Sequence, residues 1–335
     1  MKGKMLILLA VICSLSSCVK EELIGPSEKE GLPVTIGVSM SALEATTKAD
    51  TKSSATDDEA RINDGFILVF KKADVNADPN ECIGYAKVEP TDDIKGEGVT
   101  VNTITGHVRF VGIANADENL SQKLITAFAG TTKGNYAALK AMTSSQVLDD
   151  PTKLIKVGTK DEELKLPPTN EKINIEVVQL VARVDFTVPS ITTNAGVWRF
   201  NISSYTVTSV CKESDLIIEN GGKNGREDVI YDIKNKEVAN NKVLFYTYQT
   251  SKVIKLSVTG QLVNESTNET KSQTYSVDLK PQANLGHLTD GFVHGWAYNI
   301  EGKINVQNST LTVVITVRKW DNCEVDVDYG DYDKY

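Results

Sequence analysis

Cys18 is the residue with the clearest chemical role in this sequence, because of what precedes it. Two lysines are followed by an apolar run, Met5 to Leu15, and then by two serines directly before the cysteine. A basic start, an apolar run of about a dozen residues and small residues at the cut are typical of a secretory signal peptide, too short to span a bilayer. Leu15-Ser16-Ser17-Cys18 has the form of a bacterial lipobox. In a lipobox, signal peptidase II cuts before the cysteine, and acyl chains such as palmitate are attached to that cysteine. We therefore predict a lipoprotein signal peptide over residues 1–17 and lipidation of Cys18.

The residues after Cys18 indicate where the lipid anchor would sit. Several acyl chains make a durable anchor, since each buried CH2 contributes about 0.8 kcal/mol. Val19-Lys20-Glu21-Glu22 resembles the lysine-plus-acidic signal that sends lipoproteins of Bacteroidetes to the outer face of the outer membrane; an ordinary polar tether is the alternative. Residues 18–33 hold charges, glycines and prolines with little to pack, so we expect a mobile tether between the membrane lipid and a protein at the cell surface.

Net charge and side-chain chemistry argue against several classes of protein. A formal net charge of −9 argues against a nucleic-acid partner, which requires a basic face. The sequence contains no G-x-S-x-G, H-E-x-x-H, P-loop or G-x-G-x-x-G motif, so hydrolase, zinc-protease and nucleotide-binding activities lack their minimum parts. The histidines, which are scattered, are His107, His287 and His294. We predict a protein that is not an enzyme and that uses no cofactor or metal.

The cysteines downstream of Cys18 do not form a recognisable framework. Cys82, Cys211 and Cys323 are an odd number, widely spaced and without a C-x-x-C pair. Neither a zinc site nor a full disulfide set is therefore predicted. Three half-buried free thiols are the preferred interpretation, and a single disulfide among them remains open.

The elements that would position these groups are predicted to be mostly β-strands. Val34 to Met40 alternates as a half-buried strand does, whereas Phe66 to Phe70 is continuously apolar, as in a strand buried on both faces. Helix competes only at Leu124–Phe128 and Tyr136–Met142. Further strands are predicted at Val108–Ala114, Ile173–Val188, Trp198–Val210, Lys242–Tyr248, Val253–Leu262, Thr274–Leu279, Ala297–Val306, Leu311–Val317 and Cys323–Tyr329. Many short strands joined by Gly, Asn and Asp turns predict an all-β protein of β-sandwiches with one or two short helices.

Two breaks interrupt this pattern. Residues 44–61 contain no large apolar residue, so we expect an exposed, protease-accessible loop that contributes nothing to a core. The alternation over Ile173–Val188 slips near Val178–Leu180, which indicates a bulge or a crossing between domains. The length of 335 residues is sufficient for two domains with separate cores.

A series of short motifs, each weak alone, follows one order along residues 18–330. The motifs are Thr35–Val38 with Thr47-Lys48-Ala49, Phe66–Phe70, Val108–Ala116 with its Ala-Asn turn, Leu139–Met142, Val178–Phe186, Trp296–Ile300 and Val313–Trp320. This order resembles the Bacteroidales fimbrillins, the subunits of type V pili. The resemblance implies two transthyretin-like β-sandwich domains in tandem, an N-terminal one over 34–178 and a C-terminal one over 179–335.

The resemblance also implies polymerisation by donor-strand exchange. In that family a protease removes the first strand of a subunit, and a C-terminal strand of the neighbouring subunit fills the groove. The removable segment here would be residues 34–48, although its strand could also be permanent. Its apolar face consists of Val34, Ile36, Val38 and Met40.

The cleavage position departs from the family pattern. The family's processing enzyme prefers Arg, whereas the aligned position carries Lys48. The cut is therefore expected between Lys48 and Ala49 by a Lys-tolerant protease, or between Arg61 and Ile62, or it does not occur and the subunit stays anchored.

Two C-terminal segments alternate as a donated strand must, because such a strand bonds through its backbone while every second side chain fills the groove. The candidate donor residues are Leu311, Val313, Ile315 and Val317 in the first segment and Val325, Val327 and Tyr329 in the second. Burying four such side chains contributes on the order of 6 to 12 kcal/mol before ordering costs. Either segment could instead complete its own domain.

We therefore predict a pilin, a fimbrial subunit that is exported as a lipoprotein, trimmed, and polymerised with copies of itself or related pilins for adhesion. Host or bacterial surface receptors would be further partners. The donor-like C-terminus favours a stalk subunit over a tip subunit. The alternative, from another class, is a monomeric surface lipoprotein that binds glycan or host protein.

Overall fold

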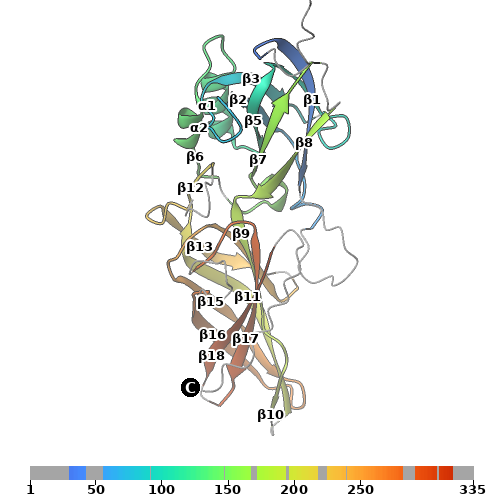
Figure 1. The fold of residues 1–335 in the computed structure, drawn as a ribbon. Coiled ribbons are helices and arrows are strands. Elements are labelled where there is room, and N and C mark those ends of the chain that lie inside the picture. The colour runs from blue at the N-terminus through green and yellow to red at the C-terminus, as the bar shows by residue number, and fades with distance from the viewer. Residues whose placement is uncertain are drawn as a thin grey trace, which may run out of the picture.

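The computed structural model describes residues 30–42, 56–90, 92–146, 148–166, 172–193, 196–217, 225–238, 240–281, 291–307 and 309–319. Strands dominate these residues and form two sets of sheets that lie end to end (Figure 1). The first set contains the N-terminal strands and both α-helices, and the second set contains the strands from β9 onward. The predicted all-β class with short helices is confirmed.

The first set is built on a seven-stranded sheet in the order β3-β2-β5-β7-β8-β1-β4. Its strands are β1 (Pro33–Ala42), β2 (Gly65–Lys71), β3 (Cys82–Val88), β4 (Val99–Ile104), β5 (Gly106–Ala114), β7 (Lys156–Leu164) and β8 (Lys172–Gln179). A Cβ on Gly84 of β3 would lie 3.0 Å from a methyl of Val101 on β4, so the two ends of the sheet lie against each other. The sheet therefore wraps around a core, which includes the fully buried Val38, Val69 and Phe110.

Helices α1 (Glu118–Phe128) and α2 (Tyr136–Lys140) cover the outer face of β2 and β5 (Figure 1). Asp117 and Asn135 start them, because each side chain accepts a hydrogen bond from a backbone N–H three residues later. The buried face of α1 is formed by Leu120, Leu124 and Phe128 at the four-residue spacing of an amphipathic helix. These side chains pack on β2, so β2 is buried on both faces, as its apolar run predicted.

The second set consists of two sheets that pack face to face around a second core. The five-stranded sheet contains β10 (Ile191–Thr193), β11 (Gly196–Cys211), β13 (Ile230–Glu237), β15 (Ile254–Asn264) and β16 (Thr270–Leu279). The four-stranded sheet has the order β14-β9-β17-β18, with β9 (Val181–Thr187), β14 (Lys242–Tyr248), β17 (Trp296–Asn305) and β18 (Thr310–Lys319). Side chains such as Phe186, Phe200 and Tyr298 fill the space between them and are fully buried.

The two sets are joined through a shared core as well as through the chain. Strands β6 (Thr143–Ser144) and β12 (Ser214–Asp215) pair across the junction, beside a short 3-10 helix at Pro151–Lys153. The Ser144 and Tyr248 hydroxyls are 2.7 Å apart in a buried hydrogen bond. Leu180, between β8 and β9, is buried in the core that the helices cover, so the predicted slip near 178–180 is a crossing between sheets.

Several strands were not predicted from their own residues, among them β3, β4, β7 and β13. In β7, no apolar side chain stands between Val157 and Leu164, and the exposed positions carry Thr159, Asp161 and Glu163. Strand β13 is exposed along most of its length. Such segments are strands because they pair with well-buried neighbours, β5 for β7 and β11 for β13. Their side-chain patterns alone do not indicate a strand.

Two features of other protein classes are absent from the part of the chain that the structure describes. Within those residues, no helix has the length and apolar character needed to cross a bilayer. In the same part of the chain, no group of three or more His, Cys, Asp or Glu side chains is arranged to hold a metal ion.

Candidate functional site: the first strand and its groove

Strand β1 lies between β8 and β4 and bridges them. Its first half pairs antiparallel with β4, from Pro33 opposite Ile104 to Val38 opposite Val99. Its second half pairs parallel with β8, from Gly37 opposite Lys172 to Ala42 opposite Val177. Because β1 overlaps both neighbours only around Gly37 and Val38, it continues the sheet from one to the other.

Both neighbours depend on β1 for their backbone hydrogen bonds. Among the described strands, β4 has no ladder partner except β1. Strand β8 pairs elsewhere only at its end, where Val178 and Gln179 lie opposite Val157 and Lys156 of β7. Removal of β1 would therefore expose unpaired N–H and C=O groups on both sides of one groove, a ready template for another strand.

The apolar face of β1 fills this groove. Val34, Ile36, Val38 and Met40, the predicted face of the removable strand, are each less than 10% exposed, and Val38 and Met40 are fully buried. They pack on Ile67, Val69, Val101, Phe110, Ile173 and Ile175. Burial of four such side chains contributes on the order of 6 to 12 kcal/mol to holding the strand.

Met40 occupies a pocket whose walls are glycines. A Cβ on Gly112 would lie 2.8 Å from the Met40 sulfur, and a Cβ on Gly65 would lie 3.0 Å from its terminal methyl. A larger residue at position 112 would collide with Met40, and one at position 65 would collide with the Ile113 carbonyl oxygen and press on the Met40 methyl. The glycines on β2 and β5 thus create room for one long side chain at the deep end of the groove.

The polar face of β1 is fastened by a few side-chain hydrogen bonds. The Ser39 hydroxyl donates to the Asn174 side-chain oxygen at 3.1 Å, and the Asn174 amide donates to Ser41 at 2.9 Å. The Thr35 hydroxyl donates to Asn102 at 2.7 Å. Ser39 is buried, whereas Thr35, Asn102 and Asn174 are exposed. Each of these bonds contributes only about 0.5 to 1.5 kcal/mol, so the apolar face and the two ladders dominate the binding of β1.

The first candidate donor segment forms β18, an edge strand of its own sheet. Its only ladder among the described strands is with β17. Leu311, Val313 and Ile315 are half-buried against the second core, while Val314 on the other face is 45% exposed. Strand β18 is therefore held by one full-length ladder and partial burial, whereas β1 is held by two half-length ladders, one on each side, and by burial of its whole apolar face.

Several predicted site residues lie outside the described residues. They are Cys18, Lys48, Ala49, Val325, Val327 and Tyr329, together with the side chain of Val317. Among the predicted free thiols, Cys82 and Cys211 are described, and both are free and buried. Cys323 also lies outside the described residues.

The prediction of an exposed loop over residues 44–61 is wrong at Glu59, although Thr56, Asp57, Asp58 and Arg61 are exposed. Residues 43–55 are outside the described residues, but 56–61 form a turn in which Glu59 is only 1% exposed. A carboxylate can be buried when charged and polar partners surround it. Glu59 has such partners in Arg183, Tyr246 and Thr56.

Three groups donate hydrogen bonds to the Glu59 carboxylate. They are the Arg183 guanidinium at 2.6 Å, the Tyr246 hydroxyl at 2.7 Å and the Thr56 backbone N–H at 2.8 Å. Arg183 is also paired with the buried Asp185 at 2.7 Å. Arg183 and Tyr246 belong to β9 and β14 of the second set, so Glu59 fastens the segment after the loop to the other half of the molecule.

Burial and the carboxylates of this cluster together set the pKa values of the two side chains that donate to Glu59. Burial by itself would lower the pKa of Arg183, but the neighbouring carboxylates of Glu59 and Asp185 outweigh it, and the pKa is raised. Burial, and then the negative charge of Glu59, raise the pKa of Tyr246 well above its usual value. The arginine therefore stays charged and the phenol stays protonated, which are the states that donate to Glu59.

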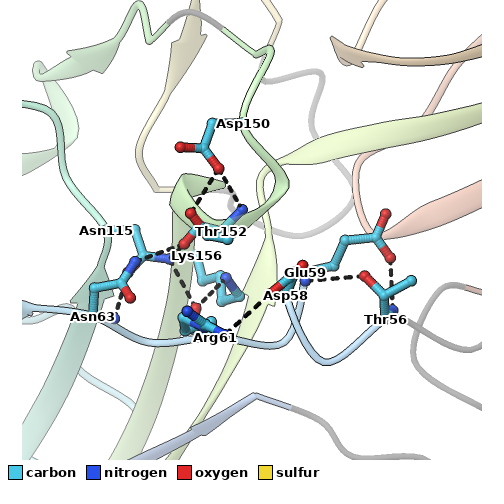
Figure 2. A network of polar contacts seen from close by, with 9 residues as sticks. All are labelled: Thr56, Asp58, Glu59, Arg61, Asn63, Asn115, Asp150, Thr152 and Lys156. Carbon is cyan, nitrogen blue, oxygen red and sulfur yellow. Dashed lines mark hydrogen bonds and ion pairs between the residues drawn. The ribbon is translucent and has the colours of Figure 1, made fainter. Parts of the chain in front are cut away.

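The other predicted cleavage position, between Arg61 and Ile62, lies two residues after Glu59, and Arg61 belongs to the network of polar contacts in Figure 2. The Arg61 carbonyl accepts hydrogen bonds from the Lys156 ammonium and from the Asn115 amide, both at 2.9 Å. The Arg61 side chain is 54% exposed and pairs with Asp58 at 3.0 Å. Ile62 is half-buried against the core around β1.

Sequence reasoning missed Glu59 and its partners, although one signal was present. Thr56-Asp57-Asp58-Glu59 has the S/T-x-x-E spacing of a capping box. The structure has both of its hydrogen bonds, since Thr56 N–H donates to Glu59 and Glu59 N–H donates to the Thr56 hydroxyl at 3.2 Å. The pairing with Arg183 joins residues 124 positions apart, and no local pattern indicates it.

Comparison with solved structures finds the same fold in fimbrial and cell-adhesion proteins. A protein of Parabacteroides distasonis assigned to cell adhesion has a TM-score of 0.56 at 14% identity, over 87% of this chain and 98% of that one. The tip fimbrial protein Mfa3 of Porphyromonas gingivalis, with a C-terminal truncation, has a TM-score of 0.52 at 12% identity, over 86% and 100%. The fimbrilin FimA of the same species has 0.51 at 14%, over 87% and 98%.

These matches confirm the fimbrillin resemblance at the level of the fold. No family model matches the chain, and no curated protein matches it by sequence. Identities this low establish a shared architecture, while activity and partners are a separate question.

Proposed function

We propose that this chain, which has the fold of fimbrial and cell-adhesion proteins, is a pilin. It would be exported as a lipoprotein through Cys18, trimmed after Lys48, and polymerised by donor-strand exchange into a surface fimbria that serves adhesion. Other copies of the chain or related pilins would be its partners. The observation that carries the proposal is that β1 is the ladder partner of both β4 and residues 172–177 of β8, so its loss leaves a groove with two open edges.

The energetics of exchange favour a donor from a neighbouring subunit. As an edge strand, β18 makes one ladder and buries Leu311, Val313 and Ile315 only in part. In the groove of a neighbour, the same strand would pair with β4 along one half and with β8 along the other, and its apolar face would be fully buried. Since its present ladder with β17 has a similar length, the net gain of the exchange would come from the fuller burial of its apolar side chains. Residues 325–329 offer the same alternation as a second candidate.

One truncation and one matched pair of substitutions test the proposal in cells that assemble the protein. The chain ending at residue 322 keeps β18 and lacks the acidic second segment. Val313→Asp places a charge on the face of β18 that faces the core, and Val314→Asp places the same charge on the exposed face. Surface material is then sheared off and examined for SDS-resistant ladders, while circular dichroism checks that the monomers fold.

The expected results assign the donor. Loss of ladders on truncation at 322 assigns it to 323–335. Ladders that survive truncation and are lost in Val313→Asp but kept in Val314→Asp assign it to β18. N-terminal sequencing of the ladders should give Ala49. Material that still begins at lipidated Cys18, or unmodified chain that never forms ladders or filaments, would refute strand exchange by this subunit.

A second candidate function is favoured by one observation. The packing of β18 on its own core completes a self-contained sandwich, as a monomeric surface lipoprotein that binds glycan or host protein would require. Electron microscopy of shed surface material separates the two candidates, since filaments that carry this chain are expected only from a pilin.

A further inference from the structure

Residues 56–62 lie between the removable strand and β2, and they are held at two points. One point is the Glu59 carboxylate, which is bound by groups of the second set of sheets. The other point is the Arg61 carbonyl, which is bound by groups of the first set (Figure 2). We define these residues as the clasp segment.

The Glu59 point joins the clasp segment to the second half of the molecule. The carboxylate accepts from Arg183 and Tyr246, and the Glu59 carbonyl accepts from the Gln179 amide at 2.8 Å. All of these residues are buried. A bond to a charged group in a buried site is among the stronger contacts in a protein, and its loss favours local opening.

The Arg61 point holds the atom that a protease must reach. A serine or cysteine protease binds its substrate as an extended strand and places the carbonyl of the residue before the cut among hydrogen-bond donors. Here the Arg61 carbonyl already accepts from Lys156 and Asn115, and the backbone turns, since Ala60 N–H bonds the Thr56 carbonyl at 2.9 Å. The exposed Arg61 side chain can enter a protease pocket, but the peptide bond beside it cannot enter the active site.

We infer that the Glu59 contacts protect the Arg61–Ile62 bond from trypsin-like proteases and make the clasp segment the downstream limit of any trimming. The folded chain resists cleavage at an exposed arginine because opening the clasp segment requires breaking buried charged hydrogen bonds first. A trimmed subunit then retains residues 56–62 across the junction of its two halves. The inference deepens the proposed function, since it sets one end of the segment that is removed, but the protection itself is a property of the single folded chain.

Limited proteolysis of the purified, full-length chain with trypsin tests this inference. Mass spectrometry and N-terminal sequencing follow the fragment that begins at Ile62. The test variant is Glu59→Gln, which removes the charge and leaves Arg183 paired with Asp185. The matched control is Asp58→Asn, which removes the neighbouring, exposed carboxylate that pairs with Arg61 itself.

We expect the Ile62 fragment to form about 10- to 100-fold faster in Glu59→Gln than in the unmodified chain, from the loss of a charged hydrogen bond. Asp58→Asn should match the unmodified chain. Cleavage after Arg109, in the middle of β5, reports global unfolding and should stay much slower than cleavage after Arg61 in both variants. If Glu59→Gln does not fold, Lys156→Met loosens the other point, the Arg61 carbonyl, with an apolar side chain of similar length, and it should release the same fragment.

The outcomes separate this inference from the proposed function. Rapid formation of the Ile62 fragment from the folded, unmodified chain would overturn the inference, as would equal rates in a folded Glu59→Gln variant. Polymers that begin at Ile62 would also overturn it and leave strand exchange standing. Monomers that resist cleavage after Arg61 but never assemble would count against the polymerisation proposal alone.

Discussion

A substitution at Met40 tests whether β1 is removed before assembly or stays in the assembled subunit. If β1 leaves before assembly, a substitution in β1 affects the precursor and is absent from the polymer. If β1 stays, the same substitution weakens both. Met40→Ala is the most informative change, because Met40 is fully buried at the deep end of the groove.

The size of the effect follows from the pocket. Truncation of a buried Met to Ala loses the transfer free energy of the removed atoms and leaves a cavity. Such changes lower the unfolding free energy by roughly 2 to 5 kcal/mol. Gly65 and Gly112 line this pocket, and a glycine has no side chain that could move into the space. The cavity should therefore persist, and we expect the precursor to lose about 3 to 5 kcal/mol of unfolding free energy.

A matched control lies beside Met40 in the parallel ladder. Ile175 of β8 is opposite Met40, is fully buried, and belongs to the part of the subunit that remains after trimming. Ile175→Ala should weaken the precursor by about 2 to 5 kcal/mol and should weaken the polymer as well. Denaturant unfolding measures the precursors, and the temperature at which SDS-resistant ladders dissociate measures the polymers.

The effects of the two substitutions on precursor and polymer should differ. We expect Met40→Ala to lower the stability of the precursor while its ladders dissociate at the temperature of the unmodified ladders. Ladders of Met40→Ala that dissociate as early as those of Ile175→Ala would show that β1 remains in the assembled subunit. The groove proposal would then be wrong, whatever the ladders are made of.

Two further predictions concern buried titratable groups. Burial lowers the pKa of His294 to about 4, so the folded chain binds fewer protons than the unfolded chain between about pH 6.5 and 4, and stability should fall by roughly 2 to 3 kcal/mol as the pH drops through that window. His294→Gln, which retains a partner for Gln249, should flatten the pH dependence in urea titrations; an equally steep curve would contradict the assignment. Burial also raises the pKa of Cys82 to about 11 and raises that of Cys211, so neither thiol should react with a thiol reagent until the chain unfolds. Peptide mapping that finds either cysteine labelled in the native protein within minutes would refute this.

The strand pattern of the core was predictable because burial leaves a local signature. The alternation of Val34 to Met40 and the apolar run of Phe66 to Phe70 both correspond to strands, β1 and β2. Strands β7 and β13 were missed, since each is kept in place by its neighbours and carries charges on its exposed side. A period of two is visible in a sequence only when one face is apolar.

The sequence by itself determined the all-β class, the two helices, and which face of the first strand is apolar. These depend on side-chain spacing over a few residues, which the chain carries locally. Only the tertiary structure decided that β1 bridges β4 and β8, that Gly65 and Gly112 make room for Met40, and that Glu59 is bound by Arg183 and Tyr246. The physical reason is that pairing partners and buried charges depend on groups far apart in the chain, so they form only when the whole chain folds.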